Sequence, residues 1–301
     1  MLPKITHRCI HGIKNENCLG DYLNSCSDCF HCFNYAEGEN LRYVSTGRWA
    51  KNSYDCNYTT GAWALECLSP FPASHVAFSA YAWWSVESYY LFYCQSCTGC
   101  FGSVSLKHQK HCVLNRSYSQ QEYQSLCGRI IDHMRSTGEW WEFFPHELSP
   151  FGYNETVAQE YFPLTESEVK SRGWNWYNAP EKSFDGGTLQ PMSISEYDEK
   201  VIWFEVAQKN IDTLLAWVVK CEITGKPFKI IKQELAFYIE HHLPIPTKHP
   251  DQRHKERMDM RNPRTLFERT CAECHKDIIT TYTPDRPERV VCEECYRKLV
   301  Y

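Results

Sequence analysis

Short apolar runs recur at a nearly constant spacing in the N-terminal part of the chain. Each run is rich in aromatic, β-branched and cysteine residues, and successive runs begin 11 to 13 residues apart between Cys29 and His111. Strands that are this short and this regular predict an all-β region, either a sandwich or a solenoid. We favour a β-solenoid with two strands in each coil of 23 residues, because that step aligns two columns of stacked positions: Cys32, Asp55, Phe78 and Phe101, and Val44, Cys67, Tyr90 and Val113.

A helix with a clear start and stop follows the β region. Ser119 and Glu122 form a capping box, apolar residues recur at helical spacing from Tyr123 to Met134, and Gly138 can end the helix. We expect this helix to cover the open end of the solenoid, because an uncovered end would pair with another chain.

The next segment, residues 139–163, is aromatic, irregular and interrupted by prolines. Such a segment is expected to wrap over other elements and to bury its rings against them. A second capping box, formed by Thr165 and Glu168, then predicts a short helix that stops at Gly173.

The C-terminal third alternates short strands and helices. Strands are expected at 216–220 and 228–231, on either side of a turn at 224–227. A helix over 233–242 and a basic helix over 251–260 follow.

Two CxxC pairs separated by seventeen residues stand near the end of the sequence. Each CxxC turn aims two sulfurs at one point, and strands 277–282 and 289–291 can pair and bring the second turn beside the first. Four cysteines fill a tetrahedral zinc site and leave no open coordination position, so we expect a structural site and not a catalytic one. The expected cofactor is one Zn²⁺ per chain, held by Cys271, Cys274, Cys292 and Cys295.

Two further cysteine motifs of the form CxxCxxC, residues 26–32 and 94–100, lie in the β region. This spacing also occurs in iron–sulfur ligation. The two copies are 68 residues apart, and three 23-residue coils would separate them by roughly 14 Å, too far for one shared metal. We favour cysteines that fill the interior of narrow coils. Separate metal sites, and redox or disulfide chemistry, remain as alternatives.

Cysteine usage and hydropathy indicate the compartment. The start of the sequence lacks an apolar signal region, and the chain has no apolar run of eighteen residues. Seventeen cysteines, an odd number arranged largely as CxxC, are typical of thiols and metal ligands in a reducing cytosol. We therefore expect a cytoplasmic protein with no membrane partner.

Charge is unevenly distributed along the chain. Residues 217–301 hold 16 Lys and Arg against 13 Asp and Glu, a net charge of +3, and the preceding 216 residues hold 16 against 24, a net charge of −8, which together give the −5 of the whole chain. An anionic partner would therefore meet the C-terminal part. Candidate nucleic-acid contacts are Arg257, Arg261, Arg264, Arg269, Arg286, Arg289, Arg297 and Lys298.

The region from 217 to the C-terminal end resembles a family of uncharacterised bacterial proteins that carry a zinc-ribbon domain. The resemblance rests on the segment that begins Cys221-Glu-Ile-Thr-Gly-Lys-Pro-Phe, on the helix that follows it, and on the terminal CxxC-x17-CxxC pattern. In that family the first ribbon carries a CxxCG turn, an EQEFY-like helix and a CPxCR turn, and a second four-cysteine ribbon often follows. Residues 105–165 are also similar to longer proteins of this kind, for which we know no assigned activity.

This chain departs from the family pattern in the first ribbon. Position by position, Cys221 keeps a cysteine, Thr224 and Gln252 replace two others, and the fourth is replaced by His249, which can still act as a metal ligand. Two neutral replacements cannot supply thiolate charge, so the resemblance implies a metal-free first ribbon, unless His254 provides a third ligand.

We therefore expect a multidomain, mainly β protein with small α+β domains at its C-terminal end. The expected parts are a β-solenoid-like region, a capping helix with the wrapping segment, a linker, a degenerate zinc-ribbon-like domain and a four-cysteine zinc ribbon, at 1–118, 119–178, 179–192, 193–268 and 269–301 respectively.

Three classes of function compete. The leading hypothesis is a non-enzymatic zinc protein whose ribbon and basic helix contact nucleic acid or a ribonucleoprotein, with the β region as an interaction scaffold. The second is a protein-interaction or structural module without nucleic acid. The third is a redox or saccharide-acting enzyme of the β region, against which the sequence offers no nucleotide loop, open metal motif or triad signature.

Overall fold

The computed structural model describes residues 5–180, 189–190, 211–241 and 243–301. The chain divides into two compact units, the first made of Met1–Asn175 with Asn262–Tyr301 and the second of Trp176–Arg261. Most of the expected linker at 179–192, and the beginning of the domain expected at 193–268, lie outside the described residues.

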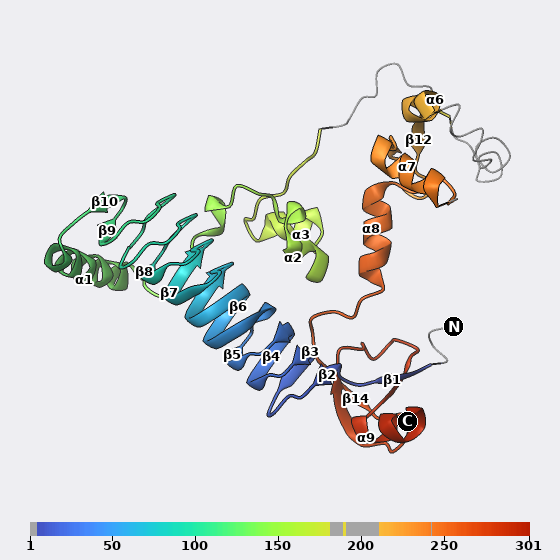
Figure 1. The fold of residues 1–301 in the computed structure, drawn as a ribbon, viewed down its shortest axis with the longest axis horizontal. Coiled ribbons are helices and arrows are strands. Elements are labelled where there is room, and N and C mark those ends of the chain that lie inside the picture. Colours follow the sequence, from blue (N-terminus) through green and yellow to red (C-terminus); the bar gives the residue numbers. More distant parts are fainter. Residues whose placement is uncertain (1–4, 181–188, 191–210, 242) are drawn as a thin grey trace. The chain divides into compact units, whose positions relative to one another are not determined.

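A parallel β-solenoid forms the larger part of the first unit (Figure 1). Its strands pair in chain order, each with the one before and the one after, and isolated bridges continue the ladder as far as Val113. The solenoid class expected from the spacing of apolar runs is confirmed. The strands are β2 (Gly12–Ile13), β3 (Leu19–Asn24), β4 (Ser27–Ala36), β5 (Glu39–Arg42), β6 (Ser45–Leu68), β7 (Ala73–Ala80) and β8 (Val86–Tyr89), followed by the small antiparallel pair β9 (Cys112–Val113) and β10 (Arg116–Ser117).

One coil of this solenoid contains twelve residues. Ser27 pairs with Glu39, and Glu39 pairs with Lys51, each twelve positions further on. The predicted coil of 23 residues with two strands is therefore wrong. Each apolar run that is interpreted above as one of two strands in a coil belongs to a complete coil of its own. The apolar pattern repeats once per coil, every twelve residues.

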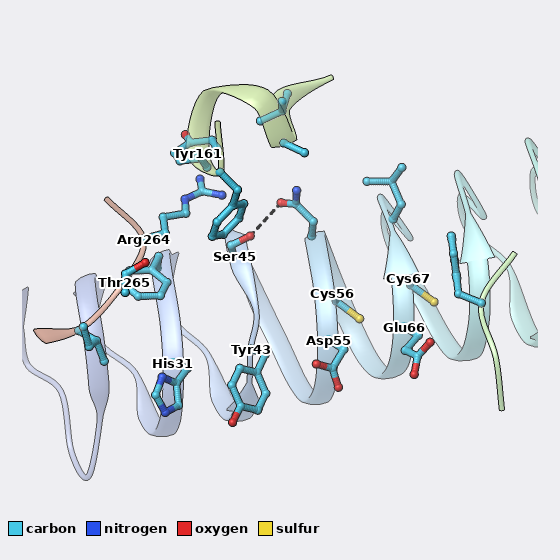
Figure 2. Close-up of a pocket in the computed structure, with 18 residues that line it drawn as sticks. His31, Tyr43, Ser45, Asp55, Cys56, Glu66, Cys67, Tyr161, Arg264 and Thr265 are labelled. Carbon is cyan, nitrogen blue, oxygen red and sulfur yellow. Dashed lines mark hydrogen bonds between the residues drawn. The ribbon is translucent and has the colours of Figure 1, made fainter. Parts of the chain in front are cut away.

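The backbone turns at every third residue. From Tyr22 to Tyr58 each third residue has a φ between 49° and 62°, a left-handed conformation that costs a non-glycine residue about 1 kcal/mol or more. Four such corners make one coil, so each coil has four sides of three residues. Residues at the same corner of successive coils form columns, and one column holds His31, Tyr43, Asp55 and Glu66 (Figure 2).

The residue after each corner lies inside the coil. A coil this narrow accepts mainly small and medium side chains, and the fully buried interior positions include Cys29, Cys32, Leu41, Val44 and Ala50. The interior thiols donate to backbone carbonyls two residues earlier, as Cys56 Sγ does to Tyr54 O at 3.1 Å. The interpretation of the CxxCxxC cysteines as core residues is thus confirmed. At twelve residues per coil the two motifs lie roughly 27 Å apart instead of 14 Å.

Helix α1 (Gln120–Thr137) covers the last coils of the solenoid. The predicted capping box is present, with Ser119 Oγ accepting from the Glu122 amide, and Gly138 ends the helix with a left-handed φ of 78°. Cys127 of α1 packs in one cluster with Val113. The first turn of α1 contacts His111 through Tyr123, and the residues just after the helix contact Tyr90, so the helix packs along the side of several coils. The predicted cover over the open end of the ladder stays a prediction.

The aromatic segment wraps onto the solenoid as expected. Trp140 lies parallel to Phe101 with ring centroids 6.5 Å apart, and it also contacts Tyr90. The elements of this segment are η2 (His146–Leu148), η3 (Tyr153–Glu155), α2 (Val157–Tyr161) and α3 (Glu166–Ser171), the last with the predicted Thr165 capping box.

The C-terminal part of the first unit consists of three strands and a helix. Strand β14 (Phe267–Thr270) pairs antiparallel with β15 (Asp277–Thr280), whereas β16 (Arg289–Val291) pairs in parallel with β1 (Thr6–Arg8) at the other end of the sequence. The predicted pairing of 277–282 with 289–291 is therefore wrong. Helix α9 (Glu293–Val300) follows β16.

The second unit has a small α+β arrangement. A sheet of order β11-β12-β13 packs near two helices, and Phe228, Ile230 and Leu235 belong to one buried cluster. The expected strands and helices are present with bounds that differ by a few residues. The elements are β11 (Leu189–Gln190), α6 (Ile211–Ala216), β12 (Val218–Lys220), β13 (Pro227–Phe228), α7 (Lys232–Glu240) and α8 (Pro250–Asp259).

Candidate metal centre

The first CxxC pair lies in a tight turn between β14 and β15. The Cys271 amide donates to the Lys276 carbonyl at 2.8 Å, and the His275 amide donates to the Cys271 carbonyl at 3.0 Å. His275 adopts a left-handed φ of 59°. This turn brings Cys271 and Cys274 to one side of the strand pair.

The second CxxC pair lies at the start of a helix and not in a hairpin turn. Cys292 is the N-cap residue of α9, and Cys295 lies in the first turn of that helix. The N-terminus of a helix carries a partial positive charge that stabilises thiolates. A metal bound here would gain from that charge as well as from the position that α9 gives the two sulfurs.

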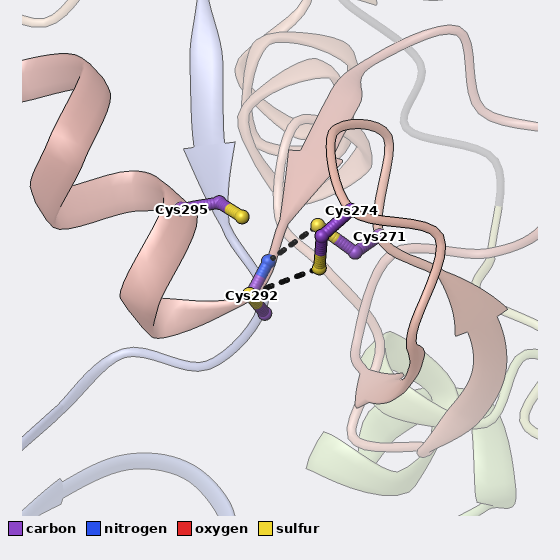
Figure 3. A group of neighbouring side chains, drawn as sticks. All are labelled: Cys271, Cys274, Cys292 and Cys295. Atoms are coloured by element: carbon purple, nitrogen blue, oxygen red, sulfur yellow. Dashed lines mark hydrogen bonds between the residues drawn. The ribbon is translucent and has the colours of Figure 1, made fainter.

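The four sulfurs converge on one point (Figure 3). All four Sγ atoms lie within 4.8 Å of one another, and Cys274 Sγ is 3.8 Å from Cys292 Sγ. Tetrahedral zinc with Zn–S bonds of about 2.3 Å requires sulfurs about 3.8 Å apart, so the observed spacing fits that ion. Within the described residues, this is the one group of three or more converging Cys, His, Asp or Glu side chains.

Backbone N–H groups stabilise the thiolate form of one of the four cysteines. Burial raises the pKa of the Cys271 thiol, but N–H groups of Cys274, Cys292 and Glu273 outweigh it and bring this pKa to about 6. The Cys292 amide donates to Cys271 Sγ at 3.2 Å. Burial and the neighbouring sulfurs raise the pKa of Cys295 to about 12. A cation would remove the mutual repulsion of the thiolates, because all four sulfurs then share its charge.

The site is chemically closed. Four sulfur donors fill a tetrahedral coordination shell, which leaves no position for a substrate or an activated water. A metal held here would join the β14–β15 turn to α9 and would stabilise the fold of this segment.

The four-cysteine module, defined as residues 262–301, is joined to the first coil of the solenoid. Besides the β1–β16 pairing, Thr281 Oγ1 donates to Asp21 Oδ2 at 2.6 Å, and the His11 amide donates to Asp21 Oδ1 at 2.6 Å. Asp21 is 1% exposed. Cys9, just after β1, packs against the cluster that contains the metal cysteines. The contacts between the module and the first coil have no local signal in the sequence, because their partners lie far apart along the chain.

The arginine and lysine residues that are predicted to contact nucleic acid lie in several different environments. Arg289 pairs with Glu273, and Arg297 Nε lies 2.9 Å from a Glu293 carboxylate oxygen. Arg269 donates to two backbone carbonyls of the module. Arg286 pairs with Glu288, Arg264 lies over the Tyr161 ring, Lys298 is on α9, and Arg257 and Arg261 belong to the second unit.

The turn that carries Cys221 in the second unit repeats the hydrogen bonds of the metal turn. The Cys221 amide donates to the Lys226 carbonyl and the Gly225 amide to the Cys221 carbonyl, both at 2.9 Å. Thr224 occupies the place of a second cysteine, and its amide donates to Cys221 Sγ at 3.5 Å. The ribbon-like turn is therefore kept although its ligand set is incomplete. The metal-free state implied by the resemblance stays a prediction, as does rescue by His254.

Comparisons of the chain with protein-family models, with curated proteins and with solved structures found no match. Among the described residues, none of the helices has the length and apolar character needed to cross a lipid bilayer.

Proposed function

We propose that this chain is a zinc-stabilised binding protein whose β-solenoid is the interaction scaffold. The metal is Zn²⁺, one per chain, and the four-cysteine module is a zinc ribbon that closes the first coil. The observation that carries the proposal is the convergence of four sulfurs in a module that shares a strand pair with β1, just before the solenoid, and a buried hydrogen bond with Asp21 of the first coil. A structural metal placed there supports the scaffold and does no chemistry itself.

The surface of the solenoid favours a protein as the partner. Aromatic side chains at the left-handed corners are about half exposed, and aromatic residues are enriched in protein interfaces. They are distributed over several coils: Tyr22, Tyr43, Trp49, Tyr58, Trp63, Trp84 and Tyr93. This is the second of the hypotheses drawn from the sequence, and the exposed rings are its main support.

Nucleic-acid or ribonucleoprotein binding remains a prediction with weaker physical support. Arg286, Arg289 and Arg297 face carboxylates of the same module, so their charge is already partly neutralised. Phosphate contacts need cations that can replace counterions. Retention of RNA or DNA in a filter-binding assay at low salt, lost on neutralising Arg257, Arg261 or Arg289, would reinstate this hypothesis.

We further propose that the chain belongs with the bacterial zinc-ribbon proteins that it resembles and that it works in the cytoplasm. The cysteines of the coils are all free thiols, many of them buried, and thiols persist in a reducing compartment. A redox or saccharide-acting enzyme of the β region stays a separate prediction.

Metal analysis with thermal unfolding tests the proposed function. We expect one zinc per purified chain and no iron, and we expect a strong chelator to lower the melting temperature by on the order of 10 °C. Re-addition of Zn²⁺ should restore the original value. A chain that melts at the same temperature with and without metal would contradict a structural zinc.

A further inference from the structure

A cleft of about 860 Å³ lies along one face of the solenoid. Its floor consists of corner and neighbouring side chains of successive coils, and its other walls come from the wrapping segment and from residues 264–266 of the four-cysteine module, just before β14 (Figure 2). Phe143, Tyr161 and Phe162 line the walls, and Arg264 and Leu266 lie at the module side. The cleft is thus built from three separate stretches of one compact unit.

Two carboxylates occupy the same corner column in the floor of this cleft. Asp55 and Glu66 follow one another on adjacent coils. Burial raises the pKa of both groups, and the charges of Asp55 and Glu142 raise that of Glu66 further. Within the described part of the chain, neither carboxylate forms an ion pair with a basic side chain. Both carboxylates of the floor are therefore available to pair with a cation of a ligand.

Among the described residues that line the cleft, Arg264 is the one lysine or arginine, and it lies in the wall. Arg264 lies with its guanidinium 3.7 Å from the centre of the Tyr161 ring and donates to Thr46 Oγ1 at 2.8 Å. It therefore holds the wall of the cleft in place. The two acidic side chains are left to recognise a ligand.

Aromatic surfaces accompany the carboxylates. The Tyr43 ring, 60% exposed, lies in the same corner column and stacks on His31 with centroids 5.0 Å apart. An ammonium or guanidinium group gains from an aromatic face as well as from a carboxylate. Apolar walls suit the side chains on either side of such a cation.

The length of the floor sets the size of the ligand. Four coils from His31 to Glu66 span about 14 Å at ~4.8 Å per coil. This distance matches about four residues of extended polypeptide at ~3.4 Å each. A short extended segment is thus long enough to touch the whole column.

From these observations we propose that the cleft binds an extended segment of a partner protein in which lysine or arginine alternates with apolar residues. The cations lie against Asp55 and Glu66, and the apolar side chains lie against Phe143 and Phe162. An anionic nucleic acid is disfavoured because the same carboxylates repel its phosphates. This inference rests on the proposed function and names the partner's chemistry.

A peptide titration on the full, zinc-loaded chain tests the proposal. The probe is a fluorescein-labelled, amidated hexapeptide of alternating leucine and lysine, and the comparison probe alternates leucine and glutamate. We expect saturable binding of the first probe and none of the second by fluorescence anisotropy. A labelled uridine oligonucleotide serves as a third probe and is also expected not to bind.

Replacing each carboxylate of the cleft by its isosteric amide removes the negative charge and keeps the shape of the side chain. Glu66→Gln and Asp55→Asn should each weaken binding of the basic peptide by about tenfold, because each removes one charge-assisted contact. Glu87→Gln is the matched control, since Glu87 is exposed and has the same left-handed conformation, φ 49°, in another column. It should change affinity less than twofold. Circular dichroism and melting temperature establish that each variant is folded.

Other results would overturn the proposal. Equal binding of the acidic and basic peptides, equal effects of Glu66→Gln and Glu87→Gln, or binding of the oligonucleotide instead of the basic peptide are each incompatible with it. The zinc-dependent melting test is independent of these titrations. If the protein needs zinc for stability but does not bind the basic peptide, the proposed zinc-stabilised scaffold stands and the proposed ligand of the cleft is wrong.

Discussion

Thr281 donates a hydrogen bond to the buried carboxylate of Asp21 across 260 positions of sequence. Asp21 also accepts from the His11 amide, so one side chain joins the first coil, the chain before it and the four-cysteine module. Burying a carboxylate is costly unless it is hydrogen-bonded. The contact therefore makes the module a part of the solenoid fold and not a separate appendage.

Thr281→Val should destabilise the first unit. The substitution keeps the shape but removes one donor to Asp21, which is 1% exposed, at a cost of about 1–3 kcal/mol. Urea unfolding followed by circular dichroism measures the change. Thr270→Val, on an exposed position of β14, is the control and should stay within about 0.5 kcal/mol.

Cys274→Ser should abolish stable zinc binding. Serine does not supply the thiolate, and the remaining three sulfurs leave the tetrahedral shell incomplete. We expect zinc content to fall from one per chain to a small fraction, with a melting temperature close to that of the chelator-treated chain. Cys18→Ser is the control, because Cys18 is not a member of the converging group. Full zinc content in Cys274→Ser would contradict the assignment.

Glu66→Gln should raise the free energy of unfolding at neutral pH. The pKa of Glu66 is raised in the folded chain, first by burial and then by the charges of Asp55 and Glu142, so the folded state holds this proton more tightly than the unfolded state does. The stability that the folded state gains by holding this proton is fully present below the unfolded pKa of about 4.3. It is lost as pH rises through the higher pKa of the folded state.

The difference between Glu66→Gln and the native chain should therefore be positive at pH 7 and should disappear in acid. Unfolding in urea at several pH values measures it, and Glu87→Gln provides the baseline. A difference that grows on acidification would show that the sign is wrong. Gained stability together with lost peptide binding would be typical of a binding site that keeps unfavourable charge for its ligand.

Ala50→Leu should destabilise the solenoid by about 1–3 kcal/mol. Ala50 is fully buried in a twelve-residue coil, and extra methylenes there force the narrow interior apart. Lys51→Leu places the same side chain on the neighbouring exposed position and should have a small effect. Thermal melting of both variants compares inside with outside. Equal destabilisation would contradict the assignment of interior and exterior positions.

Local signals in the sequence predicted several elements correctly. Ser119, Glu122 and Gly138 defined α1 because capping is a short-range interaction whose partners are three or four residues apart. The CxxC pairs defined the metal cysteines for the same reason. The spacing of apolar runs predicted an all-β region and favoured a solenoid over a sandwich, but it did not reveal the length of one coil, since a repeat of about twelve residues and a repeat of twice that length fit the same runs.

The sequence by itself determined that the N-terminal region is built of short, regularly spaced strands, where the helix after it begins and ends, and which four cysteines converge. Tertiary structure alone decided that β1 joins β16, that Thr281 reaches Asp21, and that Asp55 and Glu66 share one cleft. The physical reason is the range of the interactions. Caps and CxxC turns form between neighbours in the chain, whereas strand pairing and cleft formation depend on the path of the whole coil.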